Sequence, residues 1–523
     1  MYITTIAVCT SAILLSTVIF CASRKRRSLP KLPLPPGPKG LPVIGNILDI
    51  PSVFQWHTYQ KWAKEFDTDI LYVNLAGTDV IVLNTAEAAS DLLEKRSSIY
   101  SGRPRMSFLN DLMGWDFNFV FMDYGQQWRT HRRLMHHSFH PAAVKQHHRH
   151  LMRSTHNFLS RMLSQPRGGT VEKVRRLAGE SIITTVYGIT MEENNDPYLA
   201  IAEEGSRSII EGAVVGAFLV DVMPFLKYLP AWIPGASFQR KAMAWRQASQ
   251  RLYTLPFQAA EQNIENDKST ICFATTSLEK AAECTDNAYR RDVIQGTAAT
   301  IYVAGSETTL SAISSCILGL ILRPDVLRRA QDEVDGVVPI GELPSFAHLS
   351  RLPYITAIVK ETLRWHDAVP LGIAHKLSEE DEYKGFRIPA GATILANSWA
   401  MLHREDVYPD PFQFNPDRFM KDGKLDPSVR DPGHACWGFG RRVCQGRHFA
   451  FASIWIAIAS LVACFDIEKD RDDEGHVIEP VDEIISGITC IPVEFRSWLK
   501  PRSLFVEEVI KEAVEQDRKN EMA

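Results

Sequence analysis

The stretch that decides the fold is Trp437-Gly-Phe-Gly-Arg-Arg-Val-Cys444-Gln-Gly-Arg-His-Phe449, near the end of a chain of 523 residues. Glycines on both sides of Cys444 let the backbone turn tightly and approach a ligand closely. An apolar pattern with helical spacing begins at Phe449 and continues to Phe465. Cys444 is therefore expected at the N-terminal end of a helix, where the dipole and the free N–H groups favour a thiolate. Cys436 lacks these neighbours and is expected to be an ordinary thiol.

Two further motifs lie upstream of this stretch. In Glu361-Thr-Leu-Arg364 the acid and the base share one helix face, an arrangement that is usually a solvated ion pair. Ala304-Gly-Ser-Glu-Thr-Thr309 places hydroxyl groups and a carboxylate in a mostly apolar helix. That helix is expected from about Tyr289 to Leu322. The motif indicates either a kink with hydroxyls bonded to the backbone or an acid and an alcohol that relay protons.

Together these motifs resemble the cytochrome P-450 family, and the resemblance covers nearly the whole chain. It implies a mainly α fold with small β-sheets that binds haem b (iron protoporphyrin IX). Cys444 would be the axial ligand of the haem iron, since a thiolate ligand favours O–O cleavage. The family has Phe seven residues before this cysteine, where this chain has Trp437.

The resemblance also assigns roles to residues outside the cysteine loop. Glu307 and Thr308 would deliver protons, and Arg418 would join Glu361 and Arg364 in a structural charge network behind the haem. Further haem contacts would be Trp128, Arg132, His375, Phe439, Arg442 and Gly446. The positions that line the substrate pocket in relatives are apolar here: Phe108, Phe117, Phe121, Ile301, Ala304, Val369, Leu371 and Ile488. An apolar wall favours a lipophilic substrate.

The function implied by the resemblance is insertion of one oxygen atom from O2 into a C–H bond. Electrons would come from NADPH through a separate reductase, because no flavin domain is fused to the chain, with cytochrome b5 as an additional candidate partner. The chain most resembles fungal microsomal hydroxylases of secondary metabolism. A terpenoid is the favoured substrate, and an aromatic polyketide or an indole alkaloid is the alternative. A haem-thiolate isomerase or dehydratase that does not use O2, and a non-enzymatic membrane protein, also stay open.

Four segments are expected along the chain. Residues 1–23 are apolar and uncharged, and basic residues follow them, which is typical of a membrane anchor rather than a cleaved signal. Residues 24–50 form a basic and proline-rich hinge, 51–500 the haem-binding catalytic domain, and 501–523 a charged tail that is a surface helix or frayed. We expect a single-pass protein of the endoplasmic reticulum membrane whose catalytic domain faces the cytosol.

Composition narrows the class of protein further. The formal net charge is -4, so nothing suggests a nucleic-acid partner. The nine cysteines are widely spaced and contain no C-x-x-C pair, which argues against a zinc site or a disulfide framework. Six histidines between His136 and His150 are interpreted as a solvated basic face, which could dock an acidic redox partner. Strand patterns are expected at Ile70–Val73, Val80–Asn84, Tyr383–Ile388 and Thr393–Ala396.

Overall fold

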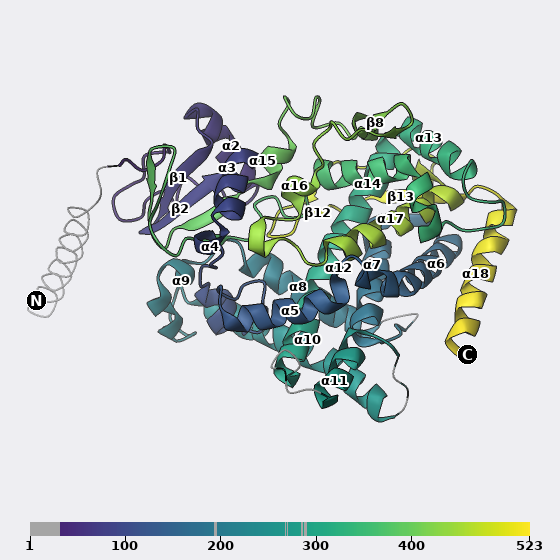
Figure 1. Ribbon diagram of the computed structural model, residues 1–523, viewed down its shortest axis with the longest axis horizontal. Coiled ribbons are helices and arrows are strands. Elements are labelled where there is room, and N and C mark those ends of the chain that lie inside the picture. Colours follow the sequence, from purple (N-terminus) through teal and green to yellow (C-terminus); the bar gives the residue numbers. More distant parts are fainter. Residues whose placement is uncertain are drawn as a thin grey trace, which may run out of the picture.

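The computed structural model describes residues 32–522, except 193–195, 267, 269, 284–285 and 287–289. The expected membrane anchor at residues 1–23 therefore lies outside the described residues. Most of the described chain is helical (Figure 1). The helices are α2 Gln55–Glu65, α3 Ala86–Ala89, α4 Ser97–Tyr100, α5 Gln126–Phe139, α6 His148–Ser164, α7 Thr170–Tyr187, α8 Pro197–Gly212, α9 Leu219–Val222, α10 Ser237–Glu265, α11 Phe273–Glu283, α12 Arg291–Leu322, α13 Pro324–Asp335, α14 Pro353–Trp365, α15 Ser398–Leu402, α16 Gly433–Cys436, α17 Arg447–Cys464 and α18 Leu504–Met522.

The sheets are small, and the largest has the strand order β1-β2-β7-β4. Its strands are β1 Ile70–Leu75, β2 Thr78–Leu83, β7 Thr393–Ala396 and β4 His375–Lys376, and β2 runs parallel to β7. A second sheet joins β10 Phe465–Lys469, β13 Arg496–Pro501 and β3 Arg167–Gly169. The remaining strands form pairs: β5 Asp381–Tyr383 with β6 Phe386–Ile388, β8 Met420–Lys421 with β9 Lys424–Leu425, and β11 Ile484–Ile485 with β12 Ile491–Pro492.

Two segments differ from the sequence-based expectation. The stretch expected as one strand at Tyr383–Ile388 is a hairpin, because Lys384 and Gly385 turn the chain with positive φ. The described part of the proline-rich hinge is docked rather than free. Tyr72 N–H donates to the carbonyl oxygen of Pro36 at 2.9 Å, and Arg387 N–H donates to that of Pro33 at 2.8 Å. The globular body therefore begins close to residue 33.

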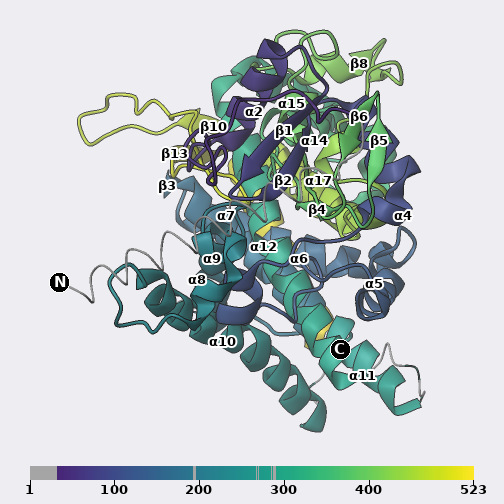
Figure 2. The same ribbon diagram turned by 90° about the vertical axis from the view of Figure 1, so that its left-hand side faces the viewer.

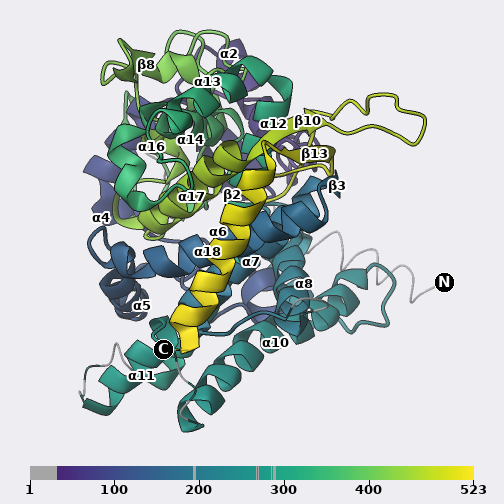
Figure 3. The ribbon, with the colours of Figure 1, turned by 90° about the vertical axis from the view of Figure 1, so that its right-hand side faces the viewer.

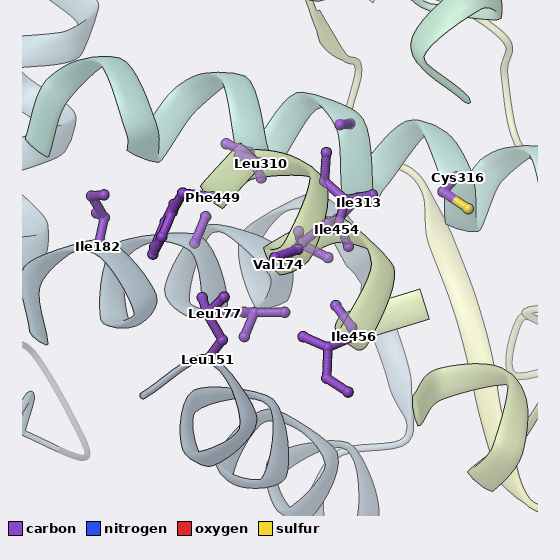
Figure 4. Close-up of a cluster of buried hydrophobic side chains, with 14 of the residues drawn as sticks. Leu151, Val174, Leu177, Ile182, Leu310, Ile313, Cys316, Phe449, Ile454 and Ile456 are labelled. Atoms are coloured by element: carbon purple, nitrogen blue, oxygen red, sulfur yellow. The ribbon is translucent and has the colours of Figure 1, made fainter. Parts of the chain in front are cut away.

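The long helix α12 runs through the middle of the molecule (Figure 2) and packs against α7, α17, α5 and α14. It begins at Arg291 and ends at Leu322, close to the bounds expected from the sequence. The core between α12, α7, α17 and α6 is built from aliphatic side chains such as Ile313, Leu177 and Ile454 (Figure 4). This packing fixes the positions of Ala304–Thr309 on α12 (the oxygen motif) and of Cys444 just before α17.

Two helices in the described part of the chain are long and apolar enough to cross a membrane, α12 and α17. Their most apolar windows are 83% and 72% buried inside the protein. Their apolar character is therefore explained by burial in the core, since a helix that is apolar all round is covered on all sides.

The C-terminal tail forms helix α18, which lies across α6 (Figure 3). Ile510 is fully buried, and the ring of His156 on α6 contacts the Asp517 carboxylate at 2.7 Å. The interpretation of the six histidines between His136 and His150 as a solvated face is wrong for His147. His147 is buried and contacts the carbonyl oxygen of Ser138 at 3.0 Å. Side chains that face α18 or the core cannot belong to a docking surface for a redox partner.

Candidate functional site

A cavity of about 310 Å³ lies between α12 and the loop that precedes α17. It is lined mostly by apolar side chains. Its wall contains most of the residues that the sequence assigned to a site: Phe121, Trp128, Arg132, Ile301, Ala304, Glu307, Thr308, Val369, His375, Phe439, Arg442, Cys444, Gly446 and Ile488. Residues from five separate parts of the chain thus meet at one place.

Cys444 lies in a tight loop whose shape depends on glycine. Its N–H donates to the carbonyl oxygen of Trp437 at 2.7 Å, which closes the loop. Gly440 has a φ of 53°, and a Cβ there would lie 2.1 Å from the carbonyl oxygen of Leu93. The Cys444 side chain is accessible from the cavity although protein surrounds it. The sulfur is therefore presented to whatever occupies the cavity.

The electrostatic surroundings of Cys444 act in opposite directions. Burial raises the pKa of Cys444 above its usual value. Two effects lower this pKa and so counteract burial. One is hydrogen bonding from the N–H groups of Gly446 and Arg447 at the start of α17, and the other is the positive charge of Arg447 and Arg132. A metal cation bound to the sulfur would deprotonate the thiol outright. The site thus suits a cysteine that is a thiolate when it binds a metal.

Three arginines gather at one side of the cavity. Arg103 is buried and donates through Nη1 to the carbonyl oxygens of Ile373 and Ala374, at 2.6 and 2.7 Å. Burial lowers the pKa of Arg132 and of Arg442 to about 10. Nη1 of Arg442 is buried and has no hydrogen-bond partner among the described residues. Buried positive charges of this kind need an anion beside them.

Trp128 and His375 complete this group. The guanidinium groups of Arg442 and Arg132 lie 4.3 and 5.3 Å from the Trp128 ring centroid. His375 contacts the carbonyl oxygen of Tyr100 through Nδ1 at 2.8 Å, so this nitrogen carries the proton. Burial lowers the pKa of His375 well below its usual value, and the charge of Arg103 adds to this effect. Nε2 therefore donates only in the charged form, which a neighbouring carboxylate would favour.

The donor set fits a haem group. The two propionate groups would supply the negative charge that the arginines require, and Cys444 would supply a sulfur ligand to the iron. Trp128, Arg132, Arg442, His375 and Arg103 are the residues that would hold the carboxylates, because guanidinium groups and indole N–H are obligate donors.

Thr308, in the oxygen motif on α12, lines the cavity. The Thr308 hydroxyl donates to the carbonyl oxygen of Ala304 at 2.8 Å. Glu307 accepts hydrogen bonds from Nη1 of Arg175 on α7, at 3.0 and 3.3 Å. Burial raises the pKa of Glu307, and the charge of Arg175 opposes this shift. The two side chains do not bond to each other in the described structure, so proton transfer between them would need a bridging water.

The charge network has the expected members. Arg364 donates to both carboxylate oxygens of Glu361, at 2.7 and 2.8 Å. Arg418 donates through Nε to the same carboxylate at 3.1 Å, and the N–H of Asn415 donates to it at 2.8 Å. Glu361 and Arg364 are fully buried. The network links α14 to the loop around Phe414–Arg418. Its members Glu361, Arg364 and Arg418 do not line the cavity.

Three residues expected in the substrate pocket do not line this cavity. Phe108 is fully buried and stacks on Phe218, with ring centroids 3.6 Å apart. Phe117 packs against Trp115 and Tyr253. Leu371 lines a second, smaller hollow of about 210 Å³, next to the wall formed by Phe121 and Ile488. Tertiary packing decides which way each of these side chains points. The position of an apolar residue in the sequence does not reveal that direction.

Arg103 and Asn118 were missed by the sequence analysis, although both line the cavity. Arg103 follows a glycine and precedes a proline, which signals only a tight loop. Asn118 stands alone among aromatic residues. Neither residue belongs to a periodic pattern, so no signal in the sequence distinguishes them from ordinary loop residues.

Comparison with known proteins agrees with this geometry. The cytochrome P450 family profile matches residues 35–493. Over 93% of the chain, the sequence is 41% identical to cytochrome P450 monooxygenase 98 of Postia placenta, covering 94% of that protein. It is 37% identical to cytochrome P450 monooxygenase ple1 of Rhodocybe pseudopiperita, covering 91% of both chains. It is 38% identical to the tryptamine 4-monooxygenase of Psilocybe cyanescens, covering 94% of this chain and 96% of that one.

The cavity with its cysteine and the named relatives define a haem-thiolate monooxygenase. The chain belongs to the cytochrome P450 family. The interpretation as a non-enzymatic membrane protein is thereby excluded. Members of this family use haem and O2 and receive electrons from a reductase.

Proposed function

We propose that the enzyme hydroxylates a C–H bond of a lipophilic molecule in fungal secondary metabolism, with a terpenoid as the favoured substrate class. The observation that carries this proposal is the apolar cavity between Cys444 and the oxygen motif on α12. Cys444 would be the iron ligand, and Glu307 and Thr308 would deliver protons. Bound haem supplies the O2 chemistry, while the protein orients the substrate and excludes water.

The partners and the location form part of the same proposal. Electrons would come from NADPH through a separate reductase, with cytochrome b5 as a candidate second donor. The protein would sit in the endoplasmic reticulum membrane through residues 1–23, with residues 51–500 in the cytosol. Deletion of residues 1–27 should release an active enzyme from membranes. Retention of the shortened protein on membranes would contradict a single anchor.

The test is reconstitution of the purified enzyme with a reductase, NADPH and a panel of terpenoids under ¹⁸O2. We expect products that carry one ¹⁸O atom per oxidation and that require NADPH. Product formation without O2 and NADPH would instead identify an isomerase or dehydratase. The retained Glu307-Thr308 pair argues against that alternative, because only oxygen activation requires proton delivery at this place.

A second candidate substrate class is an indole amine. It is favoured by the 38% identity to a relative that is named tryptamine 4-monooxygenase. Tryptamine therefore belongs in the same panel. Preferred hydroxylation of tryptamine over every terpenoid would replace the favoured substrate class.

A further inference from the structure

We infer that the far end of the cavity contains a polar subsite, formed by Asn118 and Thr300, that binds a hydroxyl group of the substrate. The inference rests on the proposed function and specifies the substrate. The molecule would be lipophilic, and it would already carry a hydroxyl group about 12 Å from the carbon that is oxidised. An earlier oxygenation or hydration reaction would have to supply it.

The side chain of Asn118 is fixed by a hydrogen bond to its amide oxygen, while its amide nitrogen has no partner in the described chain. Its relative exposure is 2%, and it lines the cavity. The side-chain Oδ1 of Asn118 accepts a hydrogen bond from Val120 N–H at 3.1 Å, and the backbone N–H of Asn118 donates to the carbonyl oxygen of Trp115 at 3.0 Å. Because Val120 N–H is a donor, the atom facing it must be the amide oxygen. Nδ2 then points away from this turn and makes no hydrogen bond to the described chain.

Thr300 lies on the helix face that meets the loop of Asn118. The carbonyl oxygen of Phe117 would lie 3.3 Å from a Cβ placed on Gly296 of α12. Thr300 follows Gly296 by one helical turn and therefore shares its face. The Thr300 hydroxyl donates to the carbonyl oxygen of Gly296 at 2.7 Å, which leaves its lone pairs to accept. The cavity wall thus offers a donor from Asn118 and an acceptor from Thr300, and one hydroxyl group can use both.

The same helix face sets the distance to the reacting end. Thr300, Ala304 and Thr308 are spaced by one turn each, and all three line the cavity. Eight residues separate Thr300 from Thr308, which corresponds to about 12 Å along the axis. Apolar side chains such as Ile301 and Phe121 line the cavity as well. A molecule that spans this distance therefore needs an apolar body and a polar group at its far end.

The carboxylates of the cavity wall argue for a neutral polar group rather than an amine. Among the described lining residues the acids are Glu307 and Asp367. Glu307 is paired with Arg175. Asp367 accepts hydrogen bonds from the Ser398 hydroxyl at 2.5 Å and from Val369 N–H at 3.1 Å. Both carboxylates already have partners, and neither belongs to the Asn118 subsite.

The experiment uses ligands that bind the iron and reach outward by a defined length. Each 1-alkylimidazole coordinates haem iron through its ring nitrogen, and an analogue of equal length ends in a hydroxyl group. Dissociation constants come from spectral titration of the holoenzyme. We expect the hydroxyl group to improve affinity about fivefold, the value of one good neutral hydrogen bond, when the chain spans about 12 Å, and to weaken binding when the chain is shorter.

Three variants test the residues themselves. Asn118→Leu removes the amide donor at nearly constant volume, and Thr300→Val removes the acceptor, so each should reduce the gain from the hydroxyl group to about twofold or less. Both should bind the plain alkylimidazoles within about twofold of the wild type. Asn110→Leu is the matched control, since Asn110 also caps its own loop through Oδ1, on Met106 N–H at 3.2 Å, but does not line the cavity.

The outcomes separate this inference from the proposed function. Absence of a gain at every chain length, or an undiminished gain in Asn118→Leu and Thr300→Val, would overturn the subsite. Equal loss in Asn110→Leu would overturn it as well, because the effect would then come from the loop. The titration requires only haem in the protein. A failure to form oxygenated products with NADPH and reductase would therefore contradict the proposed function without altering the binding result.

Discussion

Replacement of Glu361 by alanine should be among the most destabilising single substitutions in the protein. The carboxylate accepts hydrogen bonds from Arg364 at 2.7 and 2.8 Å, from Arg418 at 3.1 Å and from Asn415 N–H at 2.8 Å. Arg364 is fully buried, and Arg418 has a side-chain exposure of 6%. The substitution leaves both cations without a counter-ion, and loss of one partner of a buried pair costs about 3–5 kcal/mol.

The matched control is an ion pair with similar helical spacing on the surface. Lys61 and Glu65 are 3.7 Å apart, with side-chain exposures of 74% and 50%. Because solvent screens this pair, Glu65→Ala should cost below about 0.5 kcal/mol. Glu361→Gln, which keeps the shape and loses the charge, should fall close to Glu361→Ala.

The assay is urea denaturation of the holoenzyme, in which unfolding is monitored by tryptophan fluorescence and by haem absorbance. Coincident transitions with the two probes establish a single unfolding step, from which the free energy of unfolding is obtained. If Glu361→Ala lowers that free energy by less than about 1 kcal/mol, the argument that this network stabilises the fold is refuted.

Three further results are expected. Burial raises the pKa of Asp221 to about 7, partly offset by Phe108 N–H. The folded protein therefore keeps a proton that the unfolded chain releases, and stability should fall between about pH 4 and pH 7, by at most about 1.4 kcal/mol per pH unit. Asp221→Asn should remove this slope in urea titrations, and an unchanged slope would contradict the assignment. Thr308→Ala should lower the ratio of product formed to NADPH consumed, whereas Ser306→Ala should not; equal ratios would refute the proton-delivery role. Truncation before Leu504 should expose α6 and lower the melting temperature without loss of haem, and an unchanged melting temperature would show that α18 adds no stability.

Most of what could be predicted from the sequence came from local motifs. The Cys444 loop is readable because glycines and a helix start fall within a few residues of the cysteine. The bounds of α12 follow from a long apolar pattern with Pro324 just after it. The partnership of Arg418 with Glu361 spans 57 residues and came from the family resemblance rather than from any local pattern.

The parts that could not be predicted depend on tertiary packing. Phe108 and Phe121 are both aromatic residues before α5, yet only Phe121 lines the cavity, because Phe108 is turned against Phe218. The charged tail gave no sign that Ile510 would be buried or that Asp517 would meet His156. Contacts of this kind join segments far apart in the chain, and no periodicity records them.

The measurement that tests the central claim most directly is the carbon-monoxide difference spectrum of the dithionite-reduced protein, compared between Cys444→Ala and Cys436→Ala. Cys436 is a demanding control, because it also lines the cavity, while burial raises its pKa well above the usual value. Cys444→Ala should abolish the strongly red-shifted Soret band of a thiolate opposite CO. Cys436→Ala should retain it. A red-shifted band that persists in Cys444→Ala, or that disappears only in Cys436→Ala, would contradict the assignment of Cys444 as the iron ligand.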